Sequence, residues 1–313
     1  MGRALRVVSF GECMIELQGE AFGAMRQTYG GDSFNTAVYL ARCGRRHGLR
    51  VGYATAVGDD PLSAGLMSRW QAEGLELGHV RRIPGRLPGL YQIAVDASGE
   101  RHFSYWREQS AARAYFDAAE TPLEQHADDI DAFYFSGISL AILPPPARER
   151  LLALARRLRE RGAMVAFDNN YRPRLWPDAQ TARACYEQTY ALASVALVTL
   201  DDEMALRGSS DAAAQLEQTL ALPCAEVVVK RGAGSTLVRS GGAVIEVPTE
   251  RVPQVVDTTA AGDSFAGGYL AERLAGATPE AAARAGNRLA ARVVQHRGAI
   301  IPEAAMQDLL ATS

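Results

Sequence analysis

The chain has 313 residues, of which 48% are hydrophobic and 22% are charged, a mixture typical of a soluble globular protein. Its formal net charge of −3 provides no excess of positive charge for binding nucleic acid or an anionic membrane. Residues 1–10 contain no apolar run suited to a signal peptide, no segment resembles a transmembrane helix, and the 4 cysteines form no C-x-x-C pair. We therefore expect a cytoplasmic protein with free thiols.

Short apolar runs alternate with longer stretches of helical periodicity along most of the chain. The apolar runs are typical of buried strands: Arg6–Phe10, Val51–Val57, Ala132–Phe135, Met164–Phe167, Ala196–Leu200 and Glu226–Val229. The periodic stretches predict amphipathic helices: Ser33–Cys43, Pro61–Ala72, Pro146–Arg161, Ala179–Leu192, Asp211–Leu220, Asp263–Leu274 and Pro279–His296. Regular alternation of strands and helices implies a mainly parallel sheet covered by helices on both faces.

Two segments, at about 14–29 and 90–107, depart from this alternation. Both alternate apolar and polar residues between turn signals, as half-exposed antiparallel strands do. The second segment is typical of a hairpin with its turn at Asp96–Gly99. We expect the two segments to form one small sheet that stands apart from the main layers of a single domain, 1–313.

Several well-known sites of phosphate and metal chemistry are absent from the sequence. A Walker phosphate loop needs Gly-Lys-Ser/Thr, and the only lysine, Lys230, follows Val229. Neither G-x-G-x-x-G nor the His-Arg-Asp loop of protein kinases occurs. The 5 histidines are scattered, and no histidine or cysteine spacing indicates a metal site.

The segment Val256–Tyr269 carries the clearest signal of chemistry. Small residues at Thr259–Gly262 precede a helical pattern that begins at Asp263. Such a turn exposes backbone N–H groups at a helix N-terminus, where they can hold a phosphoryl group. A carboxylate at Asp263 could accept the proton of a substrate hydroxyl. The alternative is that Asp263 only caps the helix.

Two motifs near opposite ends of the chain identify a family. The run D-T-T-A-A-G-D-S-F-x-x-G at Asp257–Gly268 and the run G-G-D-S-F-N at Gly30–Asn35 resemble the signatures of the ribokinase-like (PfkB) carbohydrate kinases. The resemblance extends over nearly the full length. It implies an α/β, ribokinase-like three-layer fold, with a mainly parallel central sheet, helices on both faces and a small β-sheet lid over the substrate.

The resemblance also implies roles for individual residues. Asp263 is the catalytic base, and Ala260, Ala261 and Gly262 form the anion hole beside it. The positions that correspond to substrate contacts are Gly31, Asp32, Asn35, Tyr91, Tyr105, Arg107, Arg172 and Asp263. The positions that correspond to ATP contacts are Asn170, Arg172, Lys230, Gly232, Gly234, Ser235, Ala260, Ala261, Gly262 and Asn287.

The same resemblance implies that the protein binds cations. Family members use Mg²⁺, and many carry Asn-x-x-Glu, which helps to organise it. Here Leu200 replaces the asparagine while Glu203 is kept, so we expect indirect magnesium binding at Glu203. The alternative for this acidic run is a solvated helix N-terminus. Asp257 lies where many members hold a monovalent cation, which makes K⁺ a candidate cofactor.

The substrate class follows from six further segments that resemble the branch of the family acting on 2-keto-3-deoxy-D-gluconate: Gly11–Leu17, Arg86–Tyr91, Tyr105–Arg107, Phe135–Leu143, Asp168–Trp176 and Arg297–Pro302. Such a substrate presents a carboxylate, which a guanidinium fork binds well, and Arg107 and Arg172 lie in matching segments. The alternatives are a kinase for fructose or 2-keto-3-deoxygalactonate, and a non-catalytic sugar-binding regulator. The exposed lid sheet also suggests a homo-oligomer.

Overall fold

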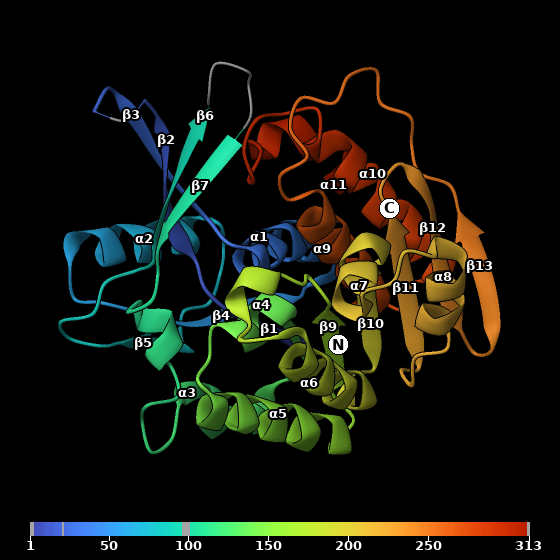
Figure 1. The fold of residues 1–313 in the computed structure, drawn as a ribbon, viewed down its shortest axis with the longest axis horizontal. Coiled ribbons are helices and arrows are strands. Elements are labelled where there is room, and N and C mark those ends of the chain that lie inside the picture. The colour runs from blue at the N-terminus through green and yellow to red at the C-terminus, as the bar shows by residue number, and fades with distance from the viewer. Residues whose placement is uncertain (1–2, 21, 96–100, 312–313) are drawn as a thin grey trace.

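A nine-stranded sheet crosses the centre of the molecule in this computed structural model, which describes residues 3–20, 22–95 and 101–311 (Figure 1). Its strands, in spatial order, are β13 (Ala243–Val247), β12 (Gly234–Ser240), β11 (Glu226–Arg231), β10 (Val195–Thr199), β9 (Met164–Asp168), β8 (Ala132–Ser136), β1 (Arg6–Phe10), β4 (Arg50–Val57) and β5 (Val80–Arg82). All neighbours from β11 to β5 are parallel, whereas β12 and β13 are antiparallel. This confirms the mainly parallel sheet.

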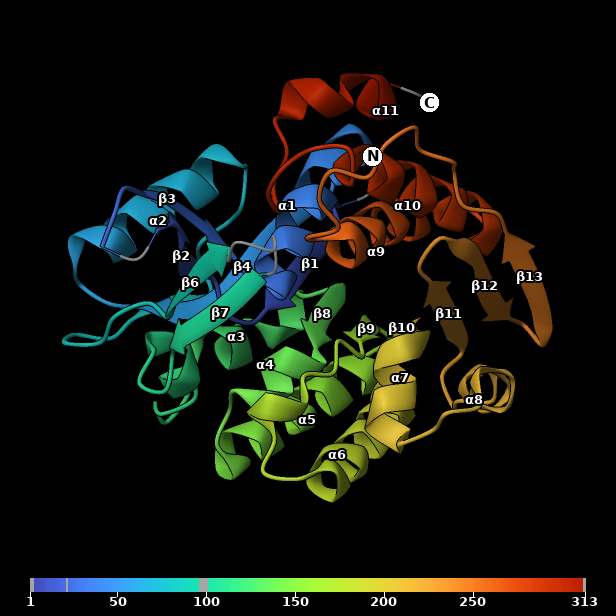
Figure 2. The same cartoon turned by 45° about the horizontal axis from the view of Figure 1, so that its top comes forward.

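Helices cover both faces of the sheet, which makes three layers (Figure 2). One face carries α1 (Asp32–Gly44), α2 (Pro61–Ala72), α9 (Ala261–Leu274) and α10 (Pro279–Val293). The other carries α3 (Pro122–Gln125), α4 (Gly137–Ala141), α5 (Pro145–Glu160), α6 (Ala179–Leu192), α7 (Leu200–Arg207) and α8 (Ala212–Leu220). A short helix, α11 (Gln307–Ala311), lies near the C-terminus. No helix in the described part of the chain combines the length and apolar character needed to span a bilayer.

The central strands are apolar on both sides because each side meets a layer of helices. In β8, Phe133 and Phe135 join the core under α4, α5 and α6, whereas Tyr134 between them joins the core under α1 and α9. Residues along a strand alternate between the two faces, so a continuous apolar run fills both cores. This explains why the apolar runs of the sequence predicted these strands well.

The second, four-stranded sheet has the order β3 (Met25–Gly30), β2 (Met14–Gly19), β6 (Leu90–Val95) and β7 (Arg101–Trp106). It stands beside the main layers, as predicted for the two alternating segments (Figure 1). The predicted turn at Asp96–Gly99 lies outside the described residues. Each hairpin is antiparallel, as expected, and the two hairpins join through β2 and β6, which pair in parallel. Both hairpins leave the main sheet through their first strand, so these two strands run in the same direction.

Helices α1 and α9 approach each other closely at Gly267. A Cβ atom at Gly267 would lie 2.7 Å from Tyr39 Cβ and 2.9 Å from the Leu40 backbone nitrogen. We therefore expect Gly267→Ala to lower the free energy of unfolding by about 1–3 kcal/mol, because neither helix can yield without losing its other contacts. Chemical denaturation measures this change.

A matched control is Gly65→Ala in α2, where a Cβ would meet only the flexible end of Arg69, at 3.2 Å. Alanine at that position should stabilise the helix by about 0.5–1 kcal/mol. Equal effects of the two substitutions would contradict the close packing of α1 on α9.

Candidate active site

The N-terminus of α9 offers unpaired backbone donors. Ala260 precedes the helix in a left-handed conformation, with φ at 60°. The amide of Ala261 donates to the Thr258 carbonyl over 3.2 Å, whereas those of Gly262 and Asp263 have no backbone acceptor among the described residues. Free amides and the dipole of a helix N-terminus together favour a bound phosphoryl group.

Asp263 lies in the first turn of α9, next to the start of α1. Asn35 Nδ2 donates a hydrogen bond to Asp263 Oδ2 over 2.8 Å. Burial raises the pKa of Asp263 to about 7, the Asp32 carboxylate contributes to the increase, and the Asn35 hydrogen bond opposes it. A carboxyl group that titrates near neutral pH suits a general base.

Asp32 and Asn170 join α1 to the end of β9. Asn170 Nδ2 donates to Asp32 Oδ2 over 2.8 Å, and burial raises the pKa of Asp32. Asn170 itself has a positive φ of 23°, and its side-chain oxygen is buried without a hydrogen-bond partner in the described structure. A strained backbone and an unsatisfied oxygen in one residue are typical of a position that contacts a ligand.

The lid brings two tyrosines toward this place. Tyr91 of β6 and Tyr105 of β7 are opposite each other, and their rings stack with centroids 5.9 Å apart. The Tyr91 hydroxyl donates to Glu16 in β2. A Cβ atom built on Gly30 would lie 3.5 Å from Asn35 Oδ1 and 3.7 Å from the Tyr91 hydroxyl. The lid tyrosine and the residues around Asp263 therefore border one space.

The two predicted carboxylate-binding arginines have different surroundings. Arg107 is buried and forms an ion pair with the buried carboxylate of Glu12. Glu12 Oε1 and Arg107 Nε have no further hydrogen-bond partner in the described structure. Arg172 lies near the surface, 3.1 Å from Asp202, and burial of Asp202 raises the pKa of that carboxyl group. Arg107 is thus held rigidly, whereas Arg172 has a partner that solvent can replace.

Half of the predicted ATP contacts lie along β11, β12 and α10, and the others lie after β9 and at the start of α9. Lys230 is near the end of β11, Gly232 occupies the turn that follows with φ at 58°, and Gly234 and Ser235 begin β12. Asn287 in α10 is buried: it accepts a hydrogen bond from Thr236 over 2.9 Å and donates to the Pro248 carbonyl over 3.1 Å. Its side chain therefore connects α10 to the antiparallel edge of the sheet.

The predicted cation residues are fully engaged by protein groups. Glu203 is buried, accepts from the Tyr190 hydroxyl over 2.6 Å and pairs with Arg207 at 3.1 Å. Asp257 accepts from the Gly298 amide and from Thr259. Within residues 3–20, 22–95 and 101–311, no three histidine, cysteine, aspartate or glutamate residues gather in a way that could hold a metal ion.

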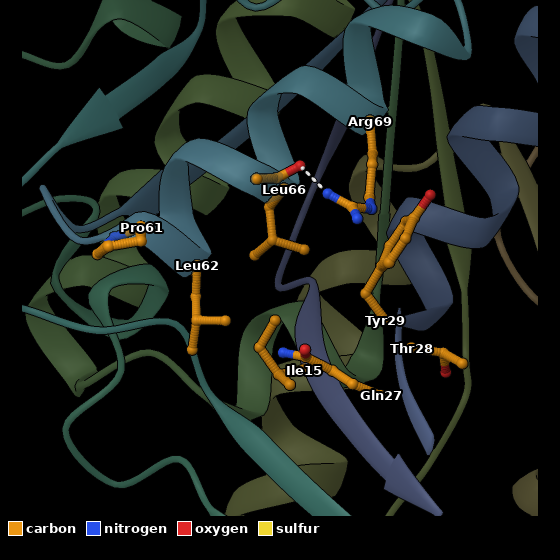
Figure 3. Close-up of a pocket in the computed structure, with 9 residues that line it drawn as sticks. Ile15, Gln27, Thr28, Tyr29, Pro61, Leu62, Leu66 and Arg69 are labelled. Atoms are coloured by element: carbon orange, nitrogen blue, oxygen red, sulfur yellow. Dashed lines mark hydrogen bonds between the residues drawn. The ribbon is translucent and has the colours of Figure 1, made fainter.

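A separate pocket of about 250 Å³ lies between the lid and α2 (Figure 3). Ile15, Tyr29, Leu62, Leu66 and Arg69 are among the residues that line it. None of the predicted site residues does so. The pocket is on the side of the lid opposite Tyr91, because Ile15 and Glu16 alternate along β2.

Comparison with known proteins agrees with this geometry. The family model described as pfkB family carbohydrate kinase matches residues 4–306. The chain belongs to the pfkB family. It is 44% identical to a 2-dehydro-3-deoxygluconokinase of Escherichia coli strain K12, over 96% of this chain and 98% of that one. It is 45% identical to a 2-dehydro-3-deoxygluconokinase of Dickeya dadantii, again over 96% and 98%.

A solved structure extends the comparison to the fold. The pfkB chain superposes on the fructokinase of Xylella fastidiosa with bound ATP, with a TM-score of 0.81, 26% identity, and coverage of 98% of this chain and 97% of that one. The predicted family and the ribokinase-like fold are therefore confirmed. The roles of individual residues stay predictions.

Two residues that the structure places at this candidate site were not predicted from the sequence. Asp168 ends β9 and pairs with Lys230, and Glu12 follows β1 and pairs with Arg107. Asp168 is the last residue of β9 and Glu12 lies just beyond β1, and both strands end at the edge of the sheet where α1 and α9 begin. Polar residues directly after parallel strands are a usable signal, since ligands bind at that edge in open α/β sheets.

Proposed function

We propose that this protein is a 2-dehydro-3-deoxygluconokinase, in other words a 2-keto-3-deoxygluconate kinase. The terminal hydroxyl of the sugar acid attacks the γ-phosphorus of ATP, and the products are the 6-phosphate and ADP. The observation that carries this proposal is the 44% identity, over 96% of the chain, to the Escherichia coli enzyme of that name. The fructokinase structure is a more distant relative, at 26% identity.

Asp263 and the start of α9 supply the chemistry. The substrate hydroxyl gives its proton to the Asp263 carboxylate as its oxygen forms the new bond to phosphorus, and the bond from phosphorus to the ADP oxygen breaks. The Gly262 and Asp263 amides stabilise the negative charge on the transferring group. Asn35, 2.8 Å from Asp263, holds the carboxylate in place.

Recognition of the acid is assigned to Arg107, with Arg172 as a second cation. Arg107 is buried, and the Glu12 carboxylate fixes one side of its guanidinium group. The planar fork leaves other N–H donors for a substrate carboxylate. Tyr91 and Tyr105 provide aromatic walls and hydroxyls for the sugar chain, and the lid keeps water away from the transferring group.

Magnesium enters this proposal as part of Mg-ATP. Glu203 does not fit direct coordination, because Tyr190, Arg207 and the protein interior already surround its carboxylate. Mg²⁺ usually keeps several waters and binds substrate phosphates, so ATP itself would be its main ligand. The Mg²⁺ ion would neutralise phosphate charge. Binding of K⁺ near Asp257 stays a prediction, and measuring activity with and without potassium tests it.

The pH dependence of kcat/KM tests the assignment of the base. Burial raises the pKa of Asp263 to about 7, and a base acts only when deprotonated, so activity should be high above pH 7. Below that value kcat/KM should fall about tenfold per pH unit. Initial rates from pH 5 to 9 measure this profile. An acid limb near the ordinary aspartate pKa, about 4, would place the base elsewhere.

A substrate panel tests the proposed function directly. ADP release with Mg-ATP should prefer 2-keto-3-deoxygluconate over fructose, ribose and 2-keto-3-deoxygalactonate. Better turnover of fructose would replace the sugar acid and leave the kinase chemistry intact. Binding of sugars without ADP release from any of them would favour the non-catalytic alternative.

We also propose that two copies associate through the lid. The lid and its base present large apolar side chains to solvent, notably Trp106 and Leu87, each 58% exposed. Exposed apolar patches of this kind often mark interfaces between proteins. Light scattering should show a dimer, and Trp106→Glu should shift it toward the monomer. A monomeric wild-type protein would contradict the proposal.

A further inference from the structure

Lys230 occupies an irregular position at the end of a central strand. It pairs with Thr199 of β10 on one side. On the other side, the pairing of β11 with β12 shifts register between Val229 and Arg231, so Lys230 lies at a β-bulge. Bulges next to active sites redirect a side chain away from the regular ladder. The bulge therefore gives the lysine side chain a direction that the strand alone would not.

The Lys230 ammonium lies between Asp168 and the first turn of α9. Its Nζ atom is 2.7 Å from Asp168 Oδ2, and the side chain is only 11% exposed. A Cβ atom built on Gly262 would lie 3.4 Å from Nζ. The ammonium thus adjoins the free amides of Gly262 and Asp263, in the space where a phosphoryl group would bind.

Several carboxylates surround this space, so a cation there is electrostatically favourable. Three carboxylates, Asp32, Asp168 and Asp263, interact electrostatically there. Asp202 is near enough to interact with the charge of Lys230. A phosphoryl group brings more negative charge, and like charges repel strongly in a partly buried site. Among the described residues, Lys230 is the only basic side chain in an ion pair with any of those three carboxylates.

We propose that Lys230 binds the transferring γ-phosphoryl group and that Asp168 is a positioning residue, which holds the Lys230 ammonium beside Gly262 before the nucleotide arrives. This inference rests on the proposed phosphoryl transfer but not on the identity of the sugar. When ATP binds, Lys230 exchanges its contact with the Asp168 carboxylate for one with the γ-phosphate. Its ammonium is a compact point charge with three donors, and it already lies beside Gly262.

Because Lys230 is the only lysine of the chain, an amine-acylating reagent reports on one side chain. The full-length protein is treated with N-hydroxysuccinimidyl acetate, and peptide mass spectrometry separates Lys230 from the N-terminal amine. A non-hydrolysable ATP analogue should slow acylation of Lys230 by at least about tenfold, whereas ADP, which lacks the γ-phosphate, should slow it less than about threefold. Equal protection by ADP, or none by the analogue, would overturn the assignment.

An internal reference comes from Arg156→Lys on the exposed face of α5. The lysine introduced there should react at one rate with and without nucleotide, which shows that the reagent itself is unaffected. Asp168→Asn should speed acylation of Lys230, because the amine then lacks the ion pair with the carboxylate that holds it in the wild-type protein. An unchanged rate in that variant would remove Asp168 from its positioning role.

Kinetics separate a catalytic from a structural role. Lys230→Met should lower kcat at least about tenfold, with the sugar KM within about threefold of wild type. The double variant Lys230→Met with Asp168→Asn removes both buried charges, so it should melt like wild type and still be slow. A double variant with wild-type kcat would overturn the proposal.

The direction in which each variant moves the acid limb of the pH profile also tests the proposal. Lys230 lowers the pKa of Asp263 and Asp168 raises it, so Lys230→Met should move the limb to higher pH and Asp168→Asn to lower pH. Movement of both limbs in one direction would overturn the arrangement. If the sugar acid is not the substrate, the analogue still protects Lys230 while the panel shows no turnover of that acid, which distinguishes the two failures.

Discussion

Replacing Asp263 with asparagine is expected to lower kcat by at least about 100-fold. General-base catalysis commonly contributes about 10²–10⁴-fold, and an amide cannot accept the proton of the attacking hydroxyl. Asparagine keeps an oxygen that can accept the 2.8 Å hydrogen bond from Asn35, and it still suits the first turn of α9. Steady-state kinetics with saturating Mg-ATP measure the loss. A variant that retains more than about a tenth of kcat would place the base elsewhere.

Asp263→Asn is expected to keep or increase stability, although it lowers activity. Burial and the nearby Asp32 carboxylate raise the pKa of Asp263 to about 7, so the charged carboxylate is unfavourable in the folded state. The contribution of Asp263 to stability falls as pH rises from about 4 to 7, because this carboxyl group binds more protons in the folded state than in the unfolded state over that range. Asp263→Asn should therefore melt at or above the wild-type temperature at pH 8, and this advantage should shrink at pH 5.

Arg107→Ala is expected to have two separate effects. Loss of a charge-assisted contact to the substrate carboxylate costs on the order of 2–3 kcal/mol, which raises the KM for the sugar acid roughly 30- to 150-fold. The carboxylate is remote from the reacting hydroxyl, so kcat should change little. The substitution also leaves Glu12 as a buried carboxylate without its partner, which typically costs about 3–5 kcal/mol of stability.

Glu12→Gln combined with Arg107→Ala separates these effects. The double variant has no unpaired buried charge, so its melting temperature should recover toward that of the wild type, while the KM for the sugar acid stays high. Glu12→Gln alone should raise that KM less, because Arg107 keeps its charge but loses its orientation. A double variant with a normal KM would remove Arg107 from the substrate site.

The fold was largely predictable because its main signals are local. Apolar runs such as Met164–Phe167 mark strands buried on both faces, and the structure has β9 at Met164–Asp168. The acidic run in segment 200–207 had a helix N-terminus as its alternative interpretation, and the segment forms α7. Strands β12 and β13 were missed because the glycines around Lys230–Ser235 are equally typical of a loop, and only pairing with β11 makes the following residues a strand.

The site was predictable only as far as motifs reach. Small residues before Asp263 indicate a helix start, and the structure begins α9 at Ala261. The pairs of Glu12 with Arg107 and of Asp168 with Lys230 join residues 95 and 62 positions apart. No local sequence pattern predicts such a pair, because the two partners of a buried ion pair come from segments that are far apart in the sequence. Residue type alone could mark Arg107 as a ligand contact but could not show what holds it.

The hydrogen bond from Asn35 to Asp263 has a consequence for how the chain is made. These residues are 228 positions apart, so a ribosome adding about 5–20 residues per second needs roughly 10–45 s to reach the second after the first. Throughout this interval, the side of α1 that carries Tyr39 and Leu40 lacks α9, which packs closely against it in the finished protein. The nascent chain therefore exposes this helix surface for longer than most folding steps take, and the proposed base, Asp263, is added only at the end of the interval.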